Sequence, residues 1–200
     1  MAERNEEVKE IAEGVLAGKT DVTEVVKRLA EGARRERQVA AAALFQVAKE
    51  KPEMLVDHID EIVNALNRPE AQTRWECLEA LTILVDYDAR ACGKAVQEAE
   101  AALFDEESGP VRLAAMRFLC KYGATTANRS EKVWPLVDEG IQCYHGDLEF
   151  NDMLTAVIDF SKGKLADEVK ASLADRMSFD AENAKGALQR RAQQVIDNLA

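Results

Sequence analysis

Apolar residues recur along the chain at the spacing of one face of an α-helix, and this helical pattern itself repeats. Three arginines, spaced 37 and 38 residues apart, mark the repeat: Arg37, Arg74 and Arg112. Seven residues after each arginine the chain has a leucine: Leu44, Leu81 and Leu119. Positions three, four and ten residues after each arginine hold Ala, Cys, Leu, Met, Val or Tyr. These offsets lie on one helix face, so the pattern predicts equivalent buried helices.

A second amphipathic segment precedes each of these helices and keeps the same register. The sequence therefore predicts five helix pairs, at residues 20–50, 52–86, 89–124, 128–162 and 164–199, with a leading helix near 4–17. Helix breakers separate the segments, for example at Pro52 and Tyr144-His145-Gly146-Asp147, and Ser130 indicates the start of a helix. Because one pair cannot bury its apolar faces alone, we expect an all-α superhelix of stacked pairs forming one domain over residues 1–200.

The register resembles that of the HEAT-repeat family. Leu103-Phe104-Asp105 followed by Val111-Arg112-Leu113-Ala114-Ala115 carries the resemblance best, and Leu66-Asn67 followed by Thr73-Arg74 carries it with Asn in place of Asp. The resemblance implies an α-solenoid in which Asp105, Arg112, Asn67 and Arg74 make polar contacts between repeats. Arg37 has Ala30 at the corresponding earlier position, so no partner is assigned to it. The related armadillo class is the alternative assignment.

The charge of the chain disfavours two classes of partner. There are 37 acidic and 26 basic residues, which gives a formal net charge of −11. Such a surface repels phosphate backbones and anionic lipid heads, so we expect neither a nucleic acid nor a membrane as the main partner. Residues 51–108 hold 14 acidic against 5 basic residues, a net −9, which suits either a basic partner or a solvated surface.

The four cysteines predict a reduced protein. They form no CxxC pair, and Cys77 and Cys120 fall on apolar helix faces, where cysteine behaves as a small hydrophobic residue. The first residues are polar and lack the apolar core of a signal peptide, and no apolar run approaches the roughly 20 residues of a membrane helix. We therefore expect a cytoplasmic location.

The sequence offers no catalytic, metal-binding or cofactor-binding set. It has no glycine-rich phosphate loop and no HExxH motif. Cys143, His145 and Asp147 supply at most three ligand types in one turn, whereas a structural zinc site needs four ligands. His58 lies among apolar residues with no nucleophile near it in sequence. We expect no cofactor and no metal.

The HEAT resemblance implies that the second helix of each pair lines a concave wall. The residues that point away from the core there form a candidate protein-binding groove: Gln38, Phe45, Trp75, Glu79, Thr82, Asp86, Arg117 and Lys121. Aromatic residues and arginine are common interface anchors, although Trp75 would serve equally well in packing against the next repeat. We therefore expect a non-enzymatic scaffold that binds a peptide or helix of another protein.

An enzyme is the alternative hypothesis. HEAT-like solenoids include alkylpurine-type DNA-repair glycosylases and bilin lyases, and Trp75 with Glu79 or Asp86 distantly resembles the aromatic and carboxylate pair of such a glycosylase. The acidic middle of the chain argues against this alternative, since DNA binding depends on neutralising phosphates.

Overall fold

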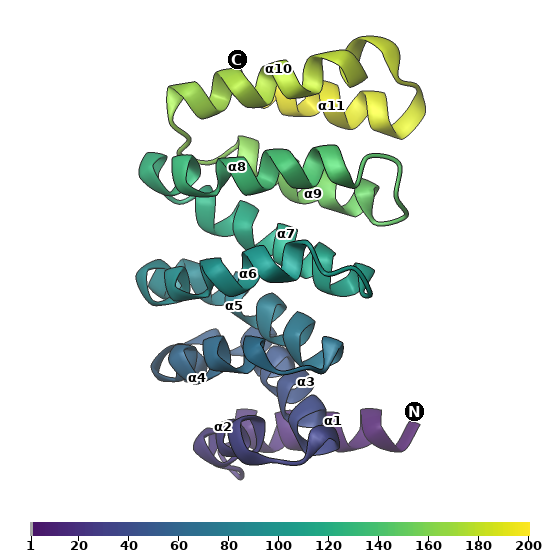
Figure 1. Ribbon diagram of the computed structural model, residues 1–200. Helices are drawn as coiled ribbons and strands as arrows, with labels where there is room; N and C mark the ends of the chain where they lie inside the picture. The colour runs from purple at the N-terminus through teal and green to yellow at the C-terminus, as the bar shows by residue number, and fades with distance from the viewer. Residues whose placement is uncertain (1) are drawn as a thin grey trace. The chain divides into compact units, whose positions relative to one another are not determined.

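The computed structural model describes residues 2–200, and nearly all of them are helical (Figure 1). Residues 2–200 contain no β-strand. The predicted all-α repeat fold is therefore confirmed. Contacts divide the chain into two compact units, of which unit 1 ends at Ala102 and unit 2 spans Leu103–Ala200.

In unit 1 the helices form two layers. Its elements are α1 (Ala2–Leu16), α2 (Val22–Glu31), α3 (Arg34–Glu50), the 3₁₀ turn η1 (Pro52–His58), α4 (Ile59–Asn64), η2 (Ala65–Asn67), α5 (Ala71–Cys92), η3 (Gly93–Ala95) and α6 (Val96–Leu103), whose last residue begins unit 2. Helix α3 packs between α1 and α5, while α2 contacts α3 and α4 contacts α5. Figure 1 shows α2 and α4 in one layer of this unit. We call α1, α3 and α5 the second-helix layer of unit 1.

Polar residues fix where these helices begin and break. The Asp21 carboxylate accepts a hydrogen bond from Thr23 N at 2.9 Å and caps α2. Asp88 has non-helical backbone angles (φ −145°, ψ 81°) inside α5, and its carboxylate accepts from Ala91 N at 2.8 Å. The boundary expected between residues 86 and 89 is therefore a kink at Asp88, and the Asp88 carboxylate caps the helical segment that follows it.

Unit 2 repeats the layered arrangement. Its elements are α7 (Gly109–Gly123), α8 (Ala127–Cys143), α9 (Phe150–Ser161), α10 (Asp167–Asn183) and α11 (Gly186–Leu199). Helix α9 contacts both α7 and α11, while α8 packs on α7 and α10 packs on α11. In Figure 1, α8 and α10 lie in one layer.

The prediction of a helix start at Ser130 was wrong. Helix α8 begins at Ala127, because the Thr126 hydroxyl accepts from Arg129 N at 3.3 Å and caps the helix. Ser130 is buried in the first turns instead, where its hydroxyl accepts from Ala166 N at 3.0 Å. A hydroxyl near a helix start can thus serve the neighbouring repeat rather than its own helix.

The repeat register places equivalent residues in the core. Leu44, Leu81 and Leu119 are each at most 1% exposed. Burying a leucine side chain stabilises a fold by roughly 1.5–3 kcal/mol, so these positions are a main source of stability in each unit.

Candidate functional site

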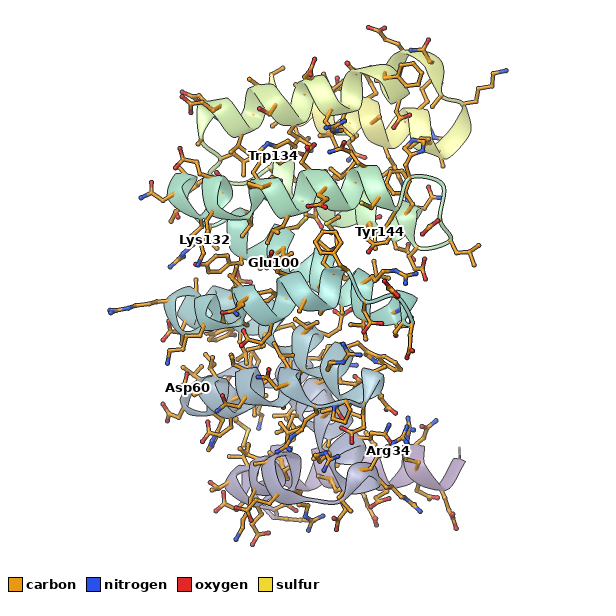
Figure 2. All side chains as sticks on the ribbon, in the orientation of Figure 1. Arg34, Asp60, Glu100, Lys132, Trp134 and Tyr144 are labelled. Carbon is orange, nitrogen blue, oxygen red and sulfur yellow. The ribbon has the colours of Figure 1, made fainter. Side chains whose placement is uncertain are left out.

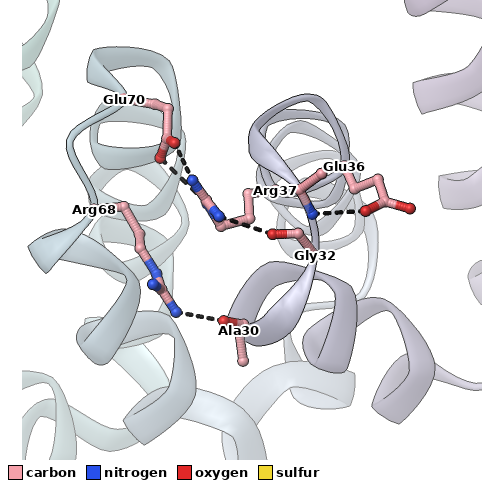
Figure 3. A network of polar contacts seen from close by, with 7 residues as sticks. Ala30, Gly32, Glu36, Arg37, Arg68 and Glu70 are labelled. Carbon is pink, nitrogen blue, oxygen red and sulfur yellow. Dashed lines mark hydrogen bonds and ion pairs between the residues drawn. The ribbon is translucent and has the colours of Figure 1, made fainter.

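An arginine of α3 is held by a carboxylate at the start of α5 (Figure 3). The Arg37 guanidinium donates to both carboxylate oxygens of Glu70, from Nε at 3.3 Å and from Nη2, and donates from Nη1 to Gly32 O at 2.8 Å. Glu70 is the N-cap residue of α5 and its side chain is 3% exposed. The hydrogen bond from Arg37 lowers the pKa of Glu70 despite its burial.

The equivalent arginine in unit 2 makes an equivalent contact. Arg112 in α7 lies 3.6 Å from a carboxylate oxygen of Glu149, which is the N-cap residue of α9. Arg112 also donates to the Asp105 carbonyl at 2.9 Å, and its guanidinium lies 5.2 Å from the centre of the ring of Tyr144. Figure 2 labels Tyr144. The Tyr144 hydroxyl in turn donates to Leu103 O at 2.7 Å.

These contacts assign a structural role to two of the register arginines. Each arginine connects its own second helix to the N-terminus of the second helix in the next repeat. The carboxylate at that N-terminus also interacts favourably with the positive end of the helix dipole. The Asp105 carboxylate itself accepts from Glu107 N and Ser108 N, at 3.0 and 2.8 Å, and so shapes the turn. Asn67 and Arg74 line one small pocket in unit 1, and a polar contact between them stays a prediction.

A hollow of about 620 Å³ lies on the second-helix layer of unit 1. Helix α1 lines it with Arg4, Asn5, Val8, Lys9, Ala12, Glu13 and Leu16, helix α3 with Ala42, Gln46 and Glu50, and helix α5 with Gln72 and Glu76. We call it the α1–α3–α5 hollow. From Arg4 to Leu16 it follows thirteen residues of helix, which span about 18 Å at a rise of 1.5 Å per residue.

Glu76 is the most perturbed carboxyl group of the hollow. Its side chain is half-buried, and burial raises its pKa above the usual glutamate value. Hydrogen bonds from the Trp75 and Gln72 side chains oppose this rise, the charge of Glu79 adds to it, and the charge of Lys49 opposes it weakly. Trp75, the residue before Glu76, is itself half-buried.

None of the eight residues predicted for the groove is among those that line this hollow. Gln38 and Phe45 are half-buried on α3, where the Lys49 ammonium lies 4.7 Å from the centre of the Phe45 ring. The Thr82 hydroxyl donates to the carbonyl of Leu78 at 2.7 Å.

The other predicted residues are divided between the two units. Glu79 is half-buried and Asp86 is exposed, both on α5 in unit 1. Arg117 and Lys121 are half-buried on α7 in unit 2. Of these four residues, Glu79 influences the hollow, because its negative charge raises the pKa of Glu76.

Sequence reasoning missed the residues that do line the hollow. The lining positions on α3 fall five, nine and thirteen residues after Arg37, on the flank that faces α1. The predicted positions were chosen because they point away from the core of their own pair, without use of the leading helix predicted near residues 4–17. The amphipathic leading segment was the available signal, since a helix stacked on α3 creates a wall on that side.

Other groups with potential chemistry include buried thiols and a histidine that faces a carboxylate. Burial raises the pKa of the Cys77 and Cys120 thiols, which removes the thiolate that a nucleophile needs. His145 Nε2 lies 3.1 Å from Asp180, but residues 2–200 contain no group of three or more possible metal ligands. Within the same residues, no helix has the length and apolar character required to cross a membrane.

The comparisons with known proteins concern the fold. No protein-family model matches the chain, and no curated protein matches it in sequence. A crystal structure of an engineered protein is similar at a TM-score of 0.76 with 18% identity, covering 96% of this chain and 83% of the other. A designed armadillo repeat protein in complex with the peptide (KR)4 matches at 0.75 with 15% identity, covering 96% and 86%.

Computationally designed armadillo repeat proteins for modular peptide recognition match at 0.74 with 16% identity, covering 95% of this chain and 86% of the other. These similarities show that the chain has the armadillo/HEAT-like helical repeat fold, as the sequence predicted.

Proposed function

We propose that this chain is a non-enzymatic scaffold that binds a polypeptide segment on the second-helix layer of unit 1. The observation that carries the proposal is the α1–α3–α5 hollow. Its length of about 18 Å accommodates roughly five residues of extended chain or three turns of helix. Trp75 and Phe45, which are sequence neighbours of the lining residues Glu76 and Gln46, are half-buried, and aromatic surface is typical of binding interfaces.

Two further observations support a binding role over a catalytic one. The described residues supply no metal-ligand group, and the buried thiols have raised pKa values. Two of the similar structures are of armadillo repeat proteins whose names refer to peptide binding or recognition. For this chain, peptide binding is a proposal that the same fold makes reasonable.

The test uses peptides selected from a displayed library of random dodecamers on the immobilised full-length chain. Their affinities are then measured by fluorescence polarisation against two variants. Gln46→Tyr places bulk in the hollow from an exposed position of α3, while Asn64→Tyr places the same bulk at an exposed position of α4. We expect Gln46→Tyr to weaken binding at least tenfold and Asn64→Tyr to leave it unchanged. Failure to enrich any peptide, or equal binding by Gln46→Tyr, refutes the proposal.

A further inference from the structure

Two side chains of opposite charge face the α1–α3–α5 hollow without a counter-ion. Arg4 on α1 is half-buried, and its Nε is buried with no hydrogen-bond partner within residues 2–200. Glu76 on α5 is half-buried and lines the hollow, and no cation of the described residues forms an ion pair with it within 4.0 Å.

The remaining charges of the lining do not compensate these two. Lys9 and Glu13 lie 3.7 Å apart on α1 and offset one another. Glu50 on α3 is exposed and adds a second negative charge to the hollow. The lining therefore leaves a positive charge on α1 and negative charges on α3 and α5.

Such an arrangement selects ligands by the sign of their charges. Removing a charged group from water is unfavourable unless an opposite charge or hydrogen bonds replace the water. A ligand that brings a cation to Glu76 and an anion to Arg4 provides both replacements. A ligand with cations alone meets Arg4 with a like charge, which disfavours it.

We propose that the segment bound in the hollow carries charges of both signs, with a Lys or Arg side chain at Glu76 and an Asp or Glu side chain at Arg4. This inference rests on the proposed function. It separates the chain from the designed armadillo protein of similar fold, whose peptide is the wholly basic (KR)4.

The experiment uses fluorescein-labelled dodecapeptides at low salt, because added salt screens partly exposed charges. A peptide of Lys-Lys-Glu-Glu repeats presents both signs on every face. Lys-Lys-Gln-Gln lacks the anion, Gln-Gln-Glu-Glu lacks the cation, and Lys-Arg repeats are wholly basic. Each is titrated with the full-length chain and with Arg4→Gln, Glu76→Gln and Gln46→Tyr.

We expect the Lys-Lys-Glu-Glu peptide to bind the unmodified chain about tenfold more tightly than each of the other three. Arg4→Gln should weaken Lys-Lys-Glu-Glu about tenfold and strengthen Lys-Lys-Gln-Gln, whose cations no longer meet a like charge. Glu76→Gln should weaken Lys-Lys-Gln-Gln and strengthen Gln-Gln-Glu-Glu for the same reason. These pairings distinguish a direct contact from a general structural effect, which would weaken every peptide.

The inference is overturned if the wholly basic peptide binds as tightly as Lys-Lys-Glu-Glu, or if either charge variant weakens all peptides alike. Because the four peptides are also compared on the unmodified chain, the test holds even if a variant folds poorly. If Gln46→Tyr abolishes binding while Arg4→Gln and Glu76→Gln do not change it, the inference alone fails. If Gln46→Tyr has no effect on any peptide, the proposed binding site fails with it.

Discussion

Replacing Arg37 by methionine tests whether the arginine–glutamate contact stabilises unit 1. The substitution keeps much of the aliphatic length and removes the hydrogen bonds to Glu70 and the one to Gly32 O. Glu70, 3% exposed, would then remain as a carboxylate with little access to water. Losing a hydrogen bond to a charged group costs about 1.5–3 kcal/mol, and because Arg37 is itself 18% exposed we expect a loss of about 2 kcal/mol at pH 7.

The matched control is Arg35→Met in the same helix. Arg35 pairs with Glu7 at 3.3 Å, but these side chains are 68% and 44% exposed. An exposed pair contributes below about 1 kcal/mol, so the control should change stability little. Urea unfolding followed by tryptophan fluorescence in a Trp134→Phe background reports on unit 1 through Trp75, and urea does not screen the ion pair as guanidinium would.

The effect of pH gives a second readout. Because Arg37 lowers the pKa of Glu70 in the folded chain, this pair stabilises the fold at pH above the unfolded value of about 4.5. The stabilisation disappears as the pH falls through the lowered folded pKa. The difference between Arg37→Met and the unmodified chain should therefore be full at pH 7 and shrink in acid. A loss no larger than that of Arg35→Met, or one independent of pH, would refute the reasoning.

Two further predictions concern stability. Glu76→Gln should raise the thermal midpoint of unfolding at pH 7, because burial disfavours the ionised carboxylate in the folded chain. This increase in the midpoint should vanish as the pH falls toward 4.5, and thermal melts at both pH values check the sign. Gly163→Ala should cost about 2 kcal/mol in urea unfolding, since the added Cβ would lie 2.6 Å from the backbone of Ala124, whereas Gly140→Ala meets the flexible end of Met116 and should be near neutral.

The fold could be predicted because its cause is periodic. Leu44, Leu81 and Leu119 occupy equivalent core positions, and burial against the neighbouring helices imposes the same residue type at each repeat. Helix starts were harder to predict. Thr126 and Ser130 both carry a hydroxyl that can cap a helix, and in the structure Thr126 accepts from Arg129 N and caps α8, whereas Ser130 accepts from the backbone N–H of Ala166.

The partner of Arg37 could not be predicted for a geometric reason. Glu70 follows Arg37 by 33 residues, whereas Glu149 follows Arg112 by 37, because the connections before the two second helices differ in length. No single sequence offset describes both contacts. What they share is the N-cap position, which is defined only after the helix starts are known. The carbonyl of Asp105 accepts a hydrogen bond from Arg112, and the contact between repeats that the resemblance implies for Asp105 stays a prediction.

The candidate site escaped prediction because it depends on charges that stand outside the repeat register. Arg37 and Arg112 recur with the repeat, and the contacts to Glu70 and Glu149 engage them in structure. A positively charged group available to a ligand in unit 1 must therefore come from elsewhere, and Arg4 is such a group because α1 belongs to no pair. In unit 1 the register arginine Arg37 is held within the stack, whereas Arg4, which lies outside the register, lines the hollow. A search for function in this fold should therefore begin with the charged residues that do not recur.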